Sequence, residues 1–294
     1  MKKIVIFMVL IISTIFLSAE QRDLSSVSSW SYWLQDININ QLTDSSADLV
    51  VIDYSQDGLD ETAFSRAQIQ SLKDEGKVVL AYLSIGEAED YRFYWQDSWE
   101  ENPPSFLGEE NPDWAGNYKV KYWKREWWRV VVRPYLRKIV SAGFDGVYLD
   151  IIDGYYYYGQ REGKLRRRAN QMVRLVEKIA RFGKRKAGDE FLIFPQNGLT
   201  ILDDTADRFK NRYLRVIDGV GVESLYYNFY NEDDKAYRVE KLEELTRENK
   251  LILNVEYIDS SSYDDYFQTI EQSDLNILGY PAHPDSALDE LIEP

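Results

Sequence analysis

Acidic side chains recur where apolar, β-rich runs of this chain end. Asp150 closes the run 143–149, and Glu223 closes the run 220–222. Further polar endings of the same kind are Asp53, Glu87, Asn197 and Glu256. Polar groups gathered at the carboxyl ends of buried parallel strands form the active site of an α/β barrel. Two such carboxyls, one protonated and one ionised, are what the hydrolysis of a glycosidic bond requires, so Asp150 and Glu223 are the candidate catalytic pair.

The amino-acid composition excludes most other kinds of catalytic site. The chain has 294 residues, no cysteine and a single histidine, His283. Thiol catalysis, disulfides and cysteine-bound metals are therefore excluded, and histidine triads or multi-histidine metal sites are not expected. We expect neither a metal nor a cofactor. With 44% hydrophobic residues, the chain is long enough for one sizeable core.

The first residues have the pattern of a targeting segment. Lys2 and Lys3 precede the apolar stretch 4–17, and Ser18-Ala19 offers a small-residue cleavage site. We therefore expect residues 1–19 to be a signal peptide or an N-terminal anchor, residues 20–29 a polar linker, and residues 30–294 the folded domain. The expected location is secreted or within the cell envelope.

The net charge of −15 limits the choice of partner. An acidic surface disfavours nucleic acid, whose binding depends on neutralising phosphates. The same surface would attract a cationic ligand, although solubility alone also explains it. Nothing in the chain implies a stable protein partner.

Strand and helix patterns alternate along the chain. We expect eight buried strands, at 31–35, 49–54, 78–84, 145–151, 191–196, 218–223, 251–256 and 276–280. Helical patterns cover 61–75, 125–142, 163–182, 203–215, 233–248 and 262–274, with a short helix at 285–292. Pro134 should kink or break the second of these helices. The alternation predicts a single (β/α)8 TIM barrel, with an open doubly wound sheet as the rival.

One connection is much longer than the others. Residues 85–124 join the third strand to its helix, and this loop is rich in tryptophan. The loop after the fourth strand carries four consecutive tyrosines, 155–158. Aromatic faces stack on the C–H faces of sugars and also pack loops onto a barrel, and we expect packing for half or more of them.

Further residues near the strand ends are candidates for substrate binding. They are Asp53, Tyr82, Glu87, Asp153, Tyr155, Asn197, Tyr226, Glu256 and Tyr257. Other roles are open for some of them: Asp53 and Asp153 could cap helices, and Glu223 could be an ion-pair partner. Glu87 and Glu256 could orient other groups. His283 follows the last strand, where a structural hydrogen bond is the commoner role.

Several segments together resemble one known family. The carriers are 30–35, Val51-Ile52-Asp53-Tyr54, 81–87, 143–153, Gln196-Asn197-Gly198, Val222-Glu223-Ser224 and Asn254-Val255-Glu256-Tyr257. Across residues 30–282 the chain resembles glycoside hydrolase family 114, the TIM-barrel endo-α-1,4-polygalactosaminidases. The resemblance implies an endo-acting glycosidase on a galactosamine polymer, with Asp150 as nucleophile and Glu223 as acid/base. The chain lacks the cysteine pairs of many members, which suggests a divergent branch with its own substrate.

Other functions fit parts of the same pattern. A non-catalytic carbohydrate-binding envelope protein could use the same fold, because a fold does not determine a function. A metal-dependent deacetylase could use the ring of carboxylates on a divalent cation, although one histidine makes this weaker. The separation of the two carboxyls would distinguish a glycosidase pair from an unrelated arrangement.

Overall fold

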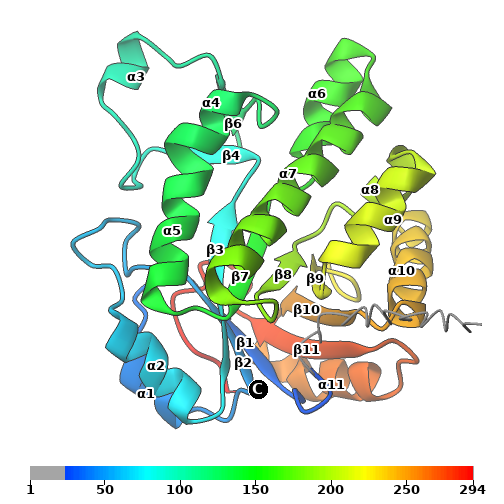
Figure 1. Ribbon diagram of the computed structural model, residues 1–294. Helices are drawn as coiled ribbons and strands as arrows, with labels where there is room; N and C mark the ends of the chain where they lie inside the picture. The colour runs from blue at the N-terminus through cyan, green and yellow to red at the C-terminus, as the bar shows by residue number, and fades with distance from the viewer. Residues whose placement is uncertain (1–23, 294) are drawn as a thin grey trace, which may run out of the picture.

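The computed structural model describes residues 24–293, and its elements alternate as predicted (Figure 1). Each of the eight expected strands is present. They are β1 (Trp30–Trp33), β2 (Leu49–Ile52), β3 (Val78–Ser84), β7 (Gly146–Asp150), β8 (Leu192–Pro195), β9 (Gly219–Glu223), β10 (Leu251–Tyr257) and β11 (Ile277–Ala282). Most are short and fully buried, as expected for strands covered on both sides.

Two groups of parallel strands form the central sheet. Hydrogen-bonded ladders give the order β1-β2-β3-β7-β8 in one group and β11-β10-β9 in the other. The groups meet at β8 and β9, where the Asp218 amide donates to the Ile193 carbonyl at 2.9 Å and the Asn197 amide donates to the Gly221 carbonyl at 2.8 Å. On the other side, the Trp30 indole of β1 donates to the Leu278 carbonyl of β11 at 3.1 Å.

The two faces of the strands bury separate hydrophobic clusters. On β2, Leu49 and Val51 belong to one cluster, whereas Val50 and Ile52 belong to the other. The smaller cluster collects side chains from β1, β2, β3, β7, β8, β10 and β11, so it fills the space that the strands enclose. The larger cluster lies between the strands and the surrounding helices. This alternation is that of a barrel with a packed interior, and the predicted TIM-barrel class is confirmed.

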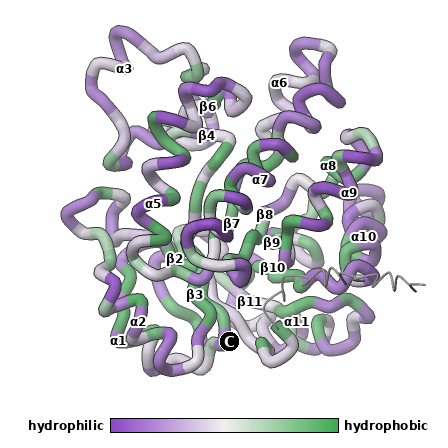
Figure 2. The backbone as a smooth tube through the Cα atoms, viewed as in Figure 1, coloured by the Kyte–Doolittle hydropathy of each residue, from purple (hydrophilic) through white to green (hydrophobic). Residues whose placement is uncertain are grey.

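Helices cover the outside of the strands, and hydrophobic residues concentrate on the strands and on the inner helix faces (Figure 2). They are α1 (Ile39–Asp44), α2 (Arg66–Asp74), α3 (Ser98–Glu101), α4 (Arg125–Trp127), η1 (Trp128–Val132), α5 (Arg133–Ala142), α6 (Gly154–Glu162), α7 (Leu165–Ala187), α8 (Ile201–Asp204), α9 (Asp207–Val216), α10 (Glu232–Arg247), η2 (Ser260–Ser262) and α11 (Tyr263–Glu271). Ser65 begins α2 with a reciprocal capping box to Gln68, which is why this helix starts later than its apolar pattern predicts.

The long connection after β3 folds into a small sheet of its own. β4 (Glu87–Glu89), β5 (Leu107–Asn111) and β6 (Trp114–Val120) pair antiparallel in the order β4-β6-β5. The mixed polar and aromatic sequence of this segment does not show the alternation that would predict strands. Several of its aromatic residues, including Trp99 and Phe106, are buried against the barrel.

Two other expectations on local structure meet different outcomes. A break near Pro134 is confirmed, because a π-helical turn, η1, directly precedes α5 and its proline. The tyrosines 155–158 are not in a loop: they lie in α6, which ends at the left-handed Gly163. Tyr155 is fully buried there and belongs to the hydrophobic cluster between the strands and the helices.

The expected last helix, at 285–292, is wrong. Ser286 and Leu288 have left-handed backbones, with φ of 59° and 52°, which interrupts a helix. The Leu288 carbonyl instead accepts the amides of Leu34 and Gln35, at 2.8 and 3.1 Å. The C-terminal segment is thereby tied to the end of β1.

The beginning of the chain is described only in part. The expected signal peptide or anchor, residues 1–19, lies outside the described residues. In the segment expected to be a linker, Leu24 and Val27 pack against the inner hydrophobic cluster, and Ser28 donates to Asp48 through its amide and hydroxyl at 2.8 and 2.7 Å. Within residues 24–293, no helix combines the length and apolar character that a membrane crossing needs.

Candidate active site

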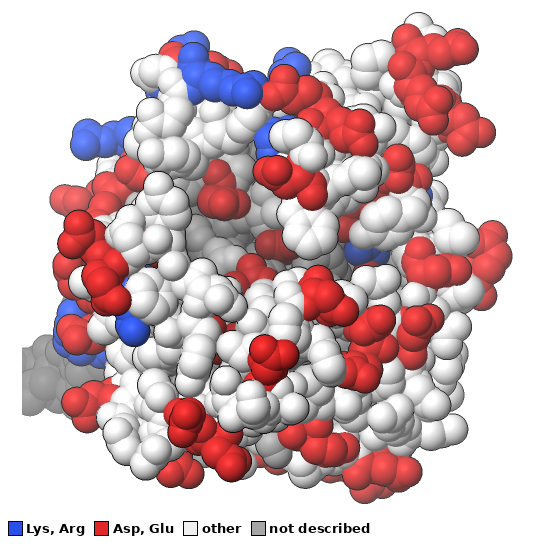
Figure 3. Space-filling view, turned by 180° about the vertical axis from the view of Figure 1, so that it is seen from behind, with Lys and Arg blue, Asp and Glu red and all other residues white. Residues whose placement is uncertain are grey.

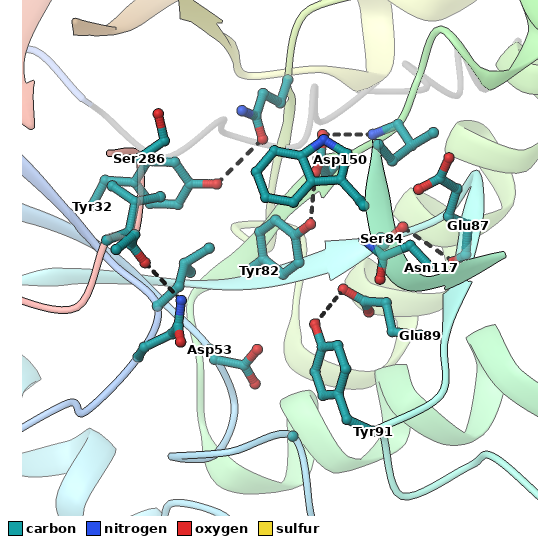
Figure 4. Close-up of a pocket in the computed structure, with 18 of the residues that line it drawn as sticks. Tyr32, Asp53, Tyr82, Ser84, Glu87, Glu89, Tyr91, Asn117, Asp150 and Ser286 are labelled. Carbon is teal, nitrogen blue, oxygen red and sulfur yellow. Dashed lines mark hydrogen bonds between the residues drawn. The ribbon is translucent and has the colours of Figure 1, made fainter. Parts of the chain in front are cut away.

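A cavity of about 860 Å³ opens at the carboxyl ends of the strands (Figure 4). Its lining includes the ends of β3, β7 and β9, part of the inserted sheet, and the C-terminal segment around Ser286. Asp150 and Glu223 both line it, so the fold brings the two predicted carboxyls to one site. The volume lies within the range of ordinary small-ligand and cofactor sites.

Asp150 ends β7 and is held at both carboxylate oxygens. The Tyr82 hydroxyl donates to Oδ2 at 2.6 Å, and the Ile151 amide donates to Oδ1 at 2.7 Å. Ile151 has a φ of 59°, which is unfavourable for a β-branched residue. Strained backbone of this kind clusters at functional sites, and here it turns an amide toward the carboxylate.

Glu223 ends β9 and is held in the same way. Its carboxylate accepts from the Tyr257 hydroxyl and, at 2.6 Å, from the Asn197 side-chain amide. The Glu223 amide donates to the Asn197 side-chain oxygen at 3.1 Å, so the two residues bind each other reciprocally. Asn197 and Ser224 have φ values of 54° and 49°. Residues with a left-handed backbone, namely Ile151, Asn197 and Ser224, thus follow the neighbouring strands β7, β8 and β9.

The two carboxyls influence each other electrostatically. Burial first, and then the nearby charge of Glu223, raise the pKa of Asp150 to about 7, against the lowering effect of the donors Tyr82 and Ile151. Below about pH 7 Asp150 therefore holds a proton. One acid and one carboxylate in a single cavity is the protonation state that glycoside hydrolysis requires.

A second carboxylate group lies beside the pair and contains Asp53. Arg92 forms an ion pair with Asp53 at 2.7 Å and another with Glu89, and all three side chains are buried. Arg92 also donates to the Tyr135 hydroxyl at 2.6 Å. Burial raises the pKa of Asp53, and the charge of Arg92 opposes this. This buried cluster forms part of the cavity wall.

The remaining predicted contact residues divide into two sets. Tyr82, Glu87, Asp153, Asn197 and Tyr257 line the cavity, as Asp53 does. Glu87 is paired there with Lys119 at 3.0 Å and accepts from the Asn111 side chain at 3.1 Å. Asp153 precedes α6 but makes no side-chain cap to it.

Tyr155, Tyr226 and Glu256 are not brought to the cavity. The Glu256 carboxylate is fully buried and accepts the amides of Leu225, Tyr226 and Tyr227 at 2.7, 2.8 and 3.2 Å, so it anchors the loop after β9.

Tyr155 and Tyr226 form their hydrogen bonds outside the cavity: the Tyr155 hydroxyl donates to Asp204 at 2.7 Å, and the Tyr226 hydroxyl donates to Ser273 at 3.4 Å. His283 is exposed and pairs with Glu290.

Several residues that line the cavity were not among the predicted site residues. Arg92, Glu89, Tyr91 and Trp114 come from the long connection after β3, and Gln196 comes from the residue before Asn197. Trp114 is 60% exposed although it lines the cavity, unlike the buried tryptophans of the same segment. The concentration of tryptophan in 85–124 was the one available signal.

Acidic residues outnumber basic residues in the lining of the cavity. Among the described residues that line the cavity, eight are Asp or Glu and one, Arg92, is basic. The face seen in Figure 3 is hollowed, and red acidic side chains surround and enter the hollow. Within residues 24–293, no group of three or more His, Asp or Glu is arranged to hold a metal ion.

The sequence model of glycoside-hydrolase family GH114 matches residues 16–280. The chain belongs to glycoside hydrolase family GH114. Protein MJ1477 of Methanocaldococcus jannaschii is 37% identical over 271 residues, covering 89% of this chain and 77% of the relative. A protein of Thermotoga maritima is 37% identical over 305 residues, covering 97% of this chain and 92% of the relative. Membership makes the protein a glycosidase by family, with a carbohydrate as its substrate.

Solved structures of other proteins share the fold of this chain. The glycoside hydrolase domain of PelA from Pseudomonas aeruginosa has a TM-score of 0.67 at 18% identity, covering 91% of this chain and 98% of that domain. Ega3 of Aspergillus fumigatus, in complex with galactosamine, has a TM-score of 0.60 at 17% identity, covering 88% of this chain and 92% of that one. At these identities the likeness concerns the fold.

Proposed function

We propose that this GH114 protein is an exported, endo-acting glycosidase that cleaves a polysaccharide containing α-1,4-linked galactosamine. The observation that carries the proposal is the coupled pair of Asp150 and Glu223, each held by a tyrosine hydroxyl and an amide donor in one acidic cavity. Such a pair supplies one proton donor and one anionic group on opposite sides of a glycosidic bond.

The charge of the cavity supports an aminosugar. Eight acidic lining residues face one arginine, which already binds Asp53 and Glu89. A sugar that carries a 2-ammonium group would gain charge-assisted hydrogen bonds there. The galactosamine bound to Ega3, a protein of the same fold, is compatible with this reading.

Asp150 is proposed as the nucleophile and Glu223 as the acid/base. When substrate binds, the proton that Asp150 holds in the free protein passes to Glu223. In the first step Glu223 donates this proton to the leaving oxygen as its bond to the anomeric carbon breaks, while a carboxylate oxygen of Asp150 bonds to that carbon. In the second step Glu223 takes a proton from water, whose oxygen replaces Asp150. Both steps balance without a cofactor.

The substrate is tested by digestion of two matched polymers, one with free amino groups and one fully N-acetylated. We expect the amino polymer to give a ladder of short oligosaccharides by mass spectrometry, and the acetylated polymer to react much more slowly. Equal rates on both would contradict the role of charge. Binding of the polymer without any cleavage would favour the carbohydrate-binding alternative.

The two roles are tested by azide rescue. Asp150→Gly with azide should release a glycosyl azide of inverted configuration, and Glu223→Ala should release one of retained configuration. The opposite pairing of variant and product would reverse the assigned roles. Export is tested separately, by sequencing the N-terminus of the protein isolated from its producing cells, which should begin near Glu20.

A further inference from the structure

Two rows of cationic side chains run along neighbouring helices on the outside of the barrel. The first row spans α4, η1 and α5, and the second lies on α7. Their members, spaced three or four residues apart, are Arg125, Arg129, Arg133 and Arg137 in the first row and Arg174, Lys178, Arg181 and Arg185 in the second. Side chains at this spacing share one side of a helix. All are exposed except Lys178, which is partly buried.

The rows face each other across the boundary of the two helices. The pKa of Lys178 is lowered by partial burial and by the charges of Arg125, Arg181 and Arg133, which come from both rows. The Lys178 ammonium also lies over the Trp128 ring, 4.1 Å from its centroid. The cations therefore form one continuous surface, which we call the α5/α7 face.

The protein leaves these charges without counter-ions. None of the eight forms an ion pair with an acidic residue in the part of the chain that the structure describes, whereas the Arg168 and Arg212 side chains close by are paired with Glu162 and Glu177. The chain has 50 acidic residues against 35 basic ones, so counter-ions are abundant elsewhere. Mutual repulsion on this face is relieved when an anionic partner binds.

The two kinds of charge are separated in space. α5 and α7 lie at the front in Figure 1, and the opposite side, in Figure 3, shows the acidic hollow with few blue side chains. At physiological salt the Debye length is about 8 Å, so dissolved ions screen the α5/α7 face from the charges of acidic residues on the far side. The local charge of the α5/α7 face is therefore positive, although the net charge of the whole chain is −15.

We propose that the α5/α7 face binds the surface of an anionic phospholipid bilayer. Seven of the eight cations are arginines, whose planar guanidinium matches phosphate oxygens in pairs. At 1.5 Å per residue, each row extends over roughly 15–20 Å, which suits an array of headgroups better than one small anion. The large exposed hydrophobic side chains of the described chain lie elsewhere, so the contact is electrostatic and does not insert into lipid.

This orientation has a consequence for the site. With the α5/α7 face on a bilayer, the acidic hollow on the opposite side stays open to polymer in solution. The proposal does not depend on which glycosidic bond the protein cleaves.

Vesicle sedimentation of the full chain tests the proposal. We expect the parent to bind vesicles of mixed phosphatidylglycerol and phosphatidylcholine more strongly than pure phosphatidylcholine, and high salt to abolish the difference. The neutral vesicles measure whatever the apolar residues 4–17 contribute. The triple variant Arg129→Gln/Arg133→Gln/Arg181→Gln should lose about a hundredfold in partitioning onto the anionic vesicles.

A matched triple, Arg66→Gln/Lys235→Gln/Arg247→Gln, changes the net charge equally on α2 and α10, and should keep most of the binding. Circular dichroism checks that both variants are folded. Equal losses in both triples, or equal binding of the parent to anionic and neutral vesicles, would overturn the proposal. Tight binding to soluble heparin without binding to vesicles would also overturn it, in favour of a polymer as partner.

Discussion

Replacement of Asp150 by Asn should make the folded protein more stable at neutral and alkaline pH while it removes hydrolysis. The folded protein holds this carboxyl at a pKa of about 7, above its ordinary value of 3.8. An acid with a raised pKa gives up its proton more readily in the unfolded chain. The stability of the parent therefore falls as pH rises from about 4 to about 7, and stays lower above that range.

The size of the effect follows from the pKa. The rise from 3.8 to about 7, at about 1.36 kcal/mol per unit, corresponds to about 4 kcal/mol once the carboxyl is fully ionised. One side of the carboxylate faces the open cavity, and the donors Tyr82 and Ile151 lose part of their hydrogen bonding to an amide. We therefore expect Asp150→Asn to gain about 2 kcal/mol at alkaline pH.

Guanidinium chloride unfolding of both proteins, at about pH 5.5 and about pH 8.5, measures the effect as a difference in the free energy of unfolding. The advantage of Asp150→Asn should grow by about 1–2 kcal/mol between the two pH values. Asp36→Asn, at an exposed carboxyl of the same cavity, is the control and should show no such growth. If the advantage is the same at both pH values, or Asp150→Asn is less stable than the parent at alkaline pH, the electrostatic account of the pair is refuted.

Three further predictions concern the site and the packed interior of the barrel. The pH profile of kcat/KM should fall above about pH 7, because Asp150 then loses the proton that the pair needs for hydrolysis; a flat profile to pH 9 would contradict this. Arg92→Gln should cost about 3–5 kcal/mol of unfolding free energy at neutral pH, since it leaves the buried Asp53 and Glu89 without their counter-charge, and the loss should shrink on acidification. Gly221→Ala should lower the free energy of unfolding by about 1–3 kcal/mol in the same assay, because the added Cβ would lie 1.8 Å from the Tyr148 hydroxyl. An unchanged stability would show that Tyr148 can move aside at no cost.

The barrel could be predicted from the sequence because its strands are nearly pure apolar runs. Such runs, separated by helical patterns of ordinary length, indicate a parallel α/β fold and leave an open doubly wound sheet as the only rival to the barrel. The acidic endings at Asp150 and Glu223 then fall at the same end of the sheet, since parallel strands all point one way. Local patterns thus determined both the fold class and the arrangement of the candidate pair.

The inserted segment was less predictable because long-range contacts decide its structure. Arg92 lies in a stretch without regular periodicity, and only the folded chain shows that it bridges Asp53 and Glu89. The prediction that Glu256 binds substrate failed for a different reason. It stands at a strand end like Glu223, but its carboxylate turns to the amides of the preceding loop rather than to the cavity. Residue type and spacing cannot distinguish these two directions.

The central claim is that Asp150 and Glu223 perform hydrolysis together on a galactosamine polymer. The most direct measurement incubates residues 20–294, Asp150→Asn and Glu223→Gln with the α-1,4-linked polymer, and follows released oligosaccharides by mass spectrometry and polymer binding in parallel. We predict oligosaccharides from the parent, none from either variant, and retained binding in all three. Release of the same oligosaccharides by either variant at the parent's rate would contradict the claim.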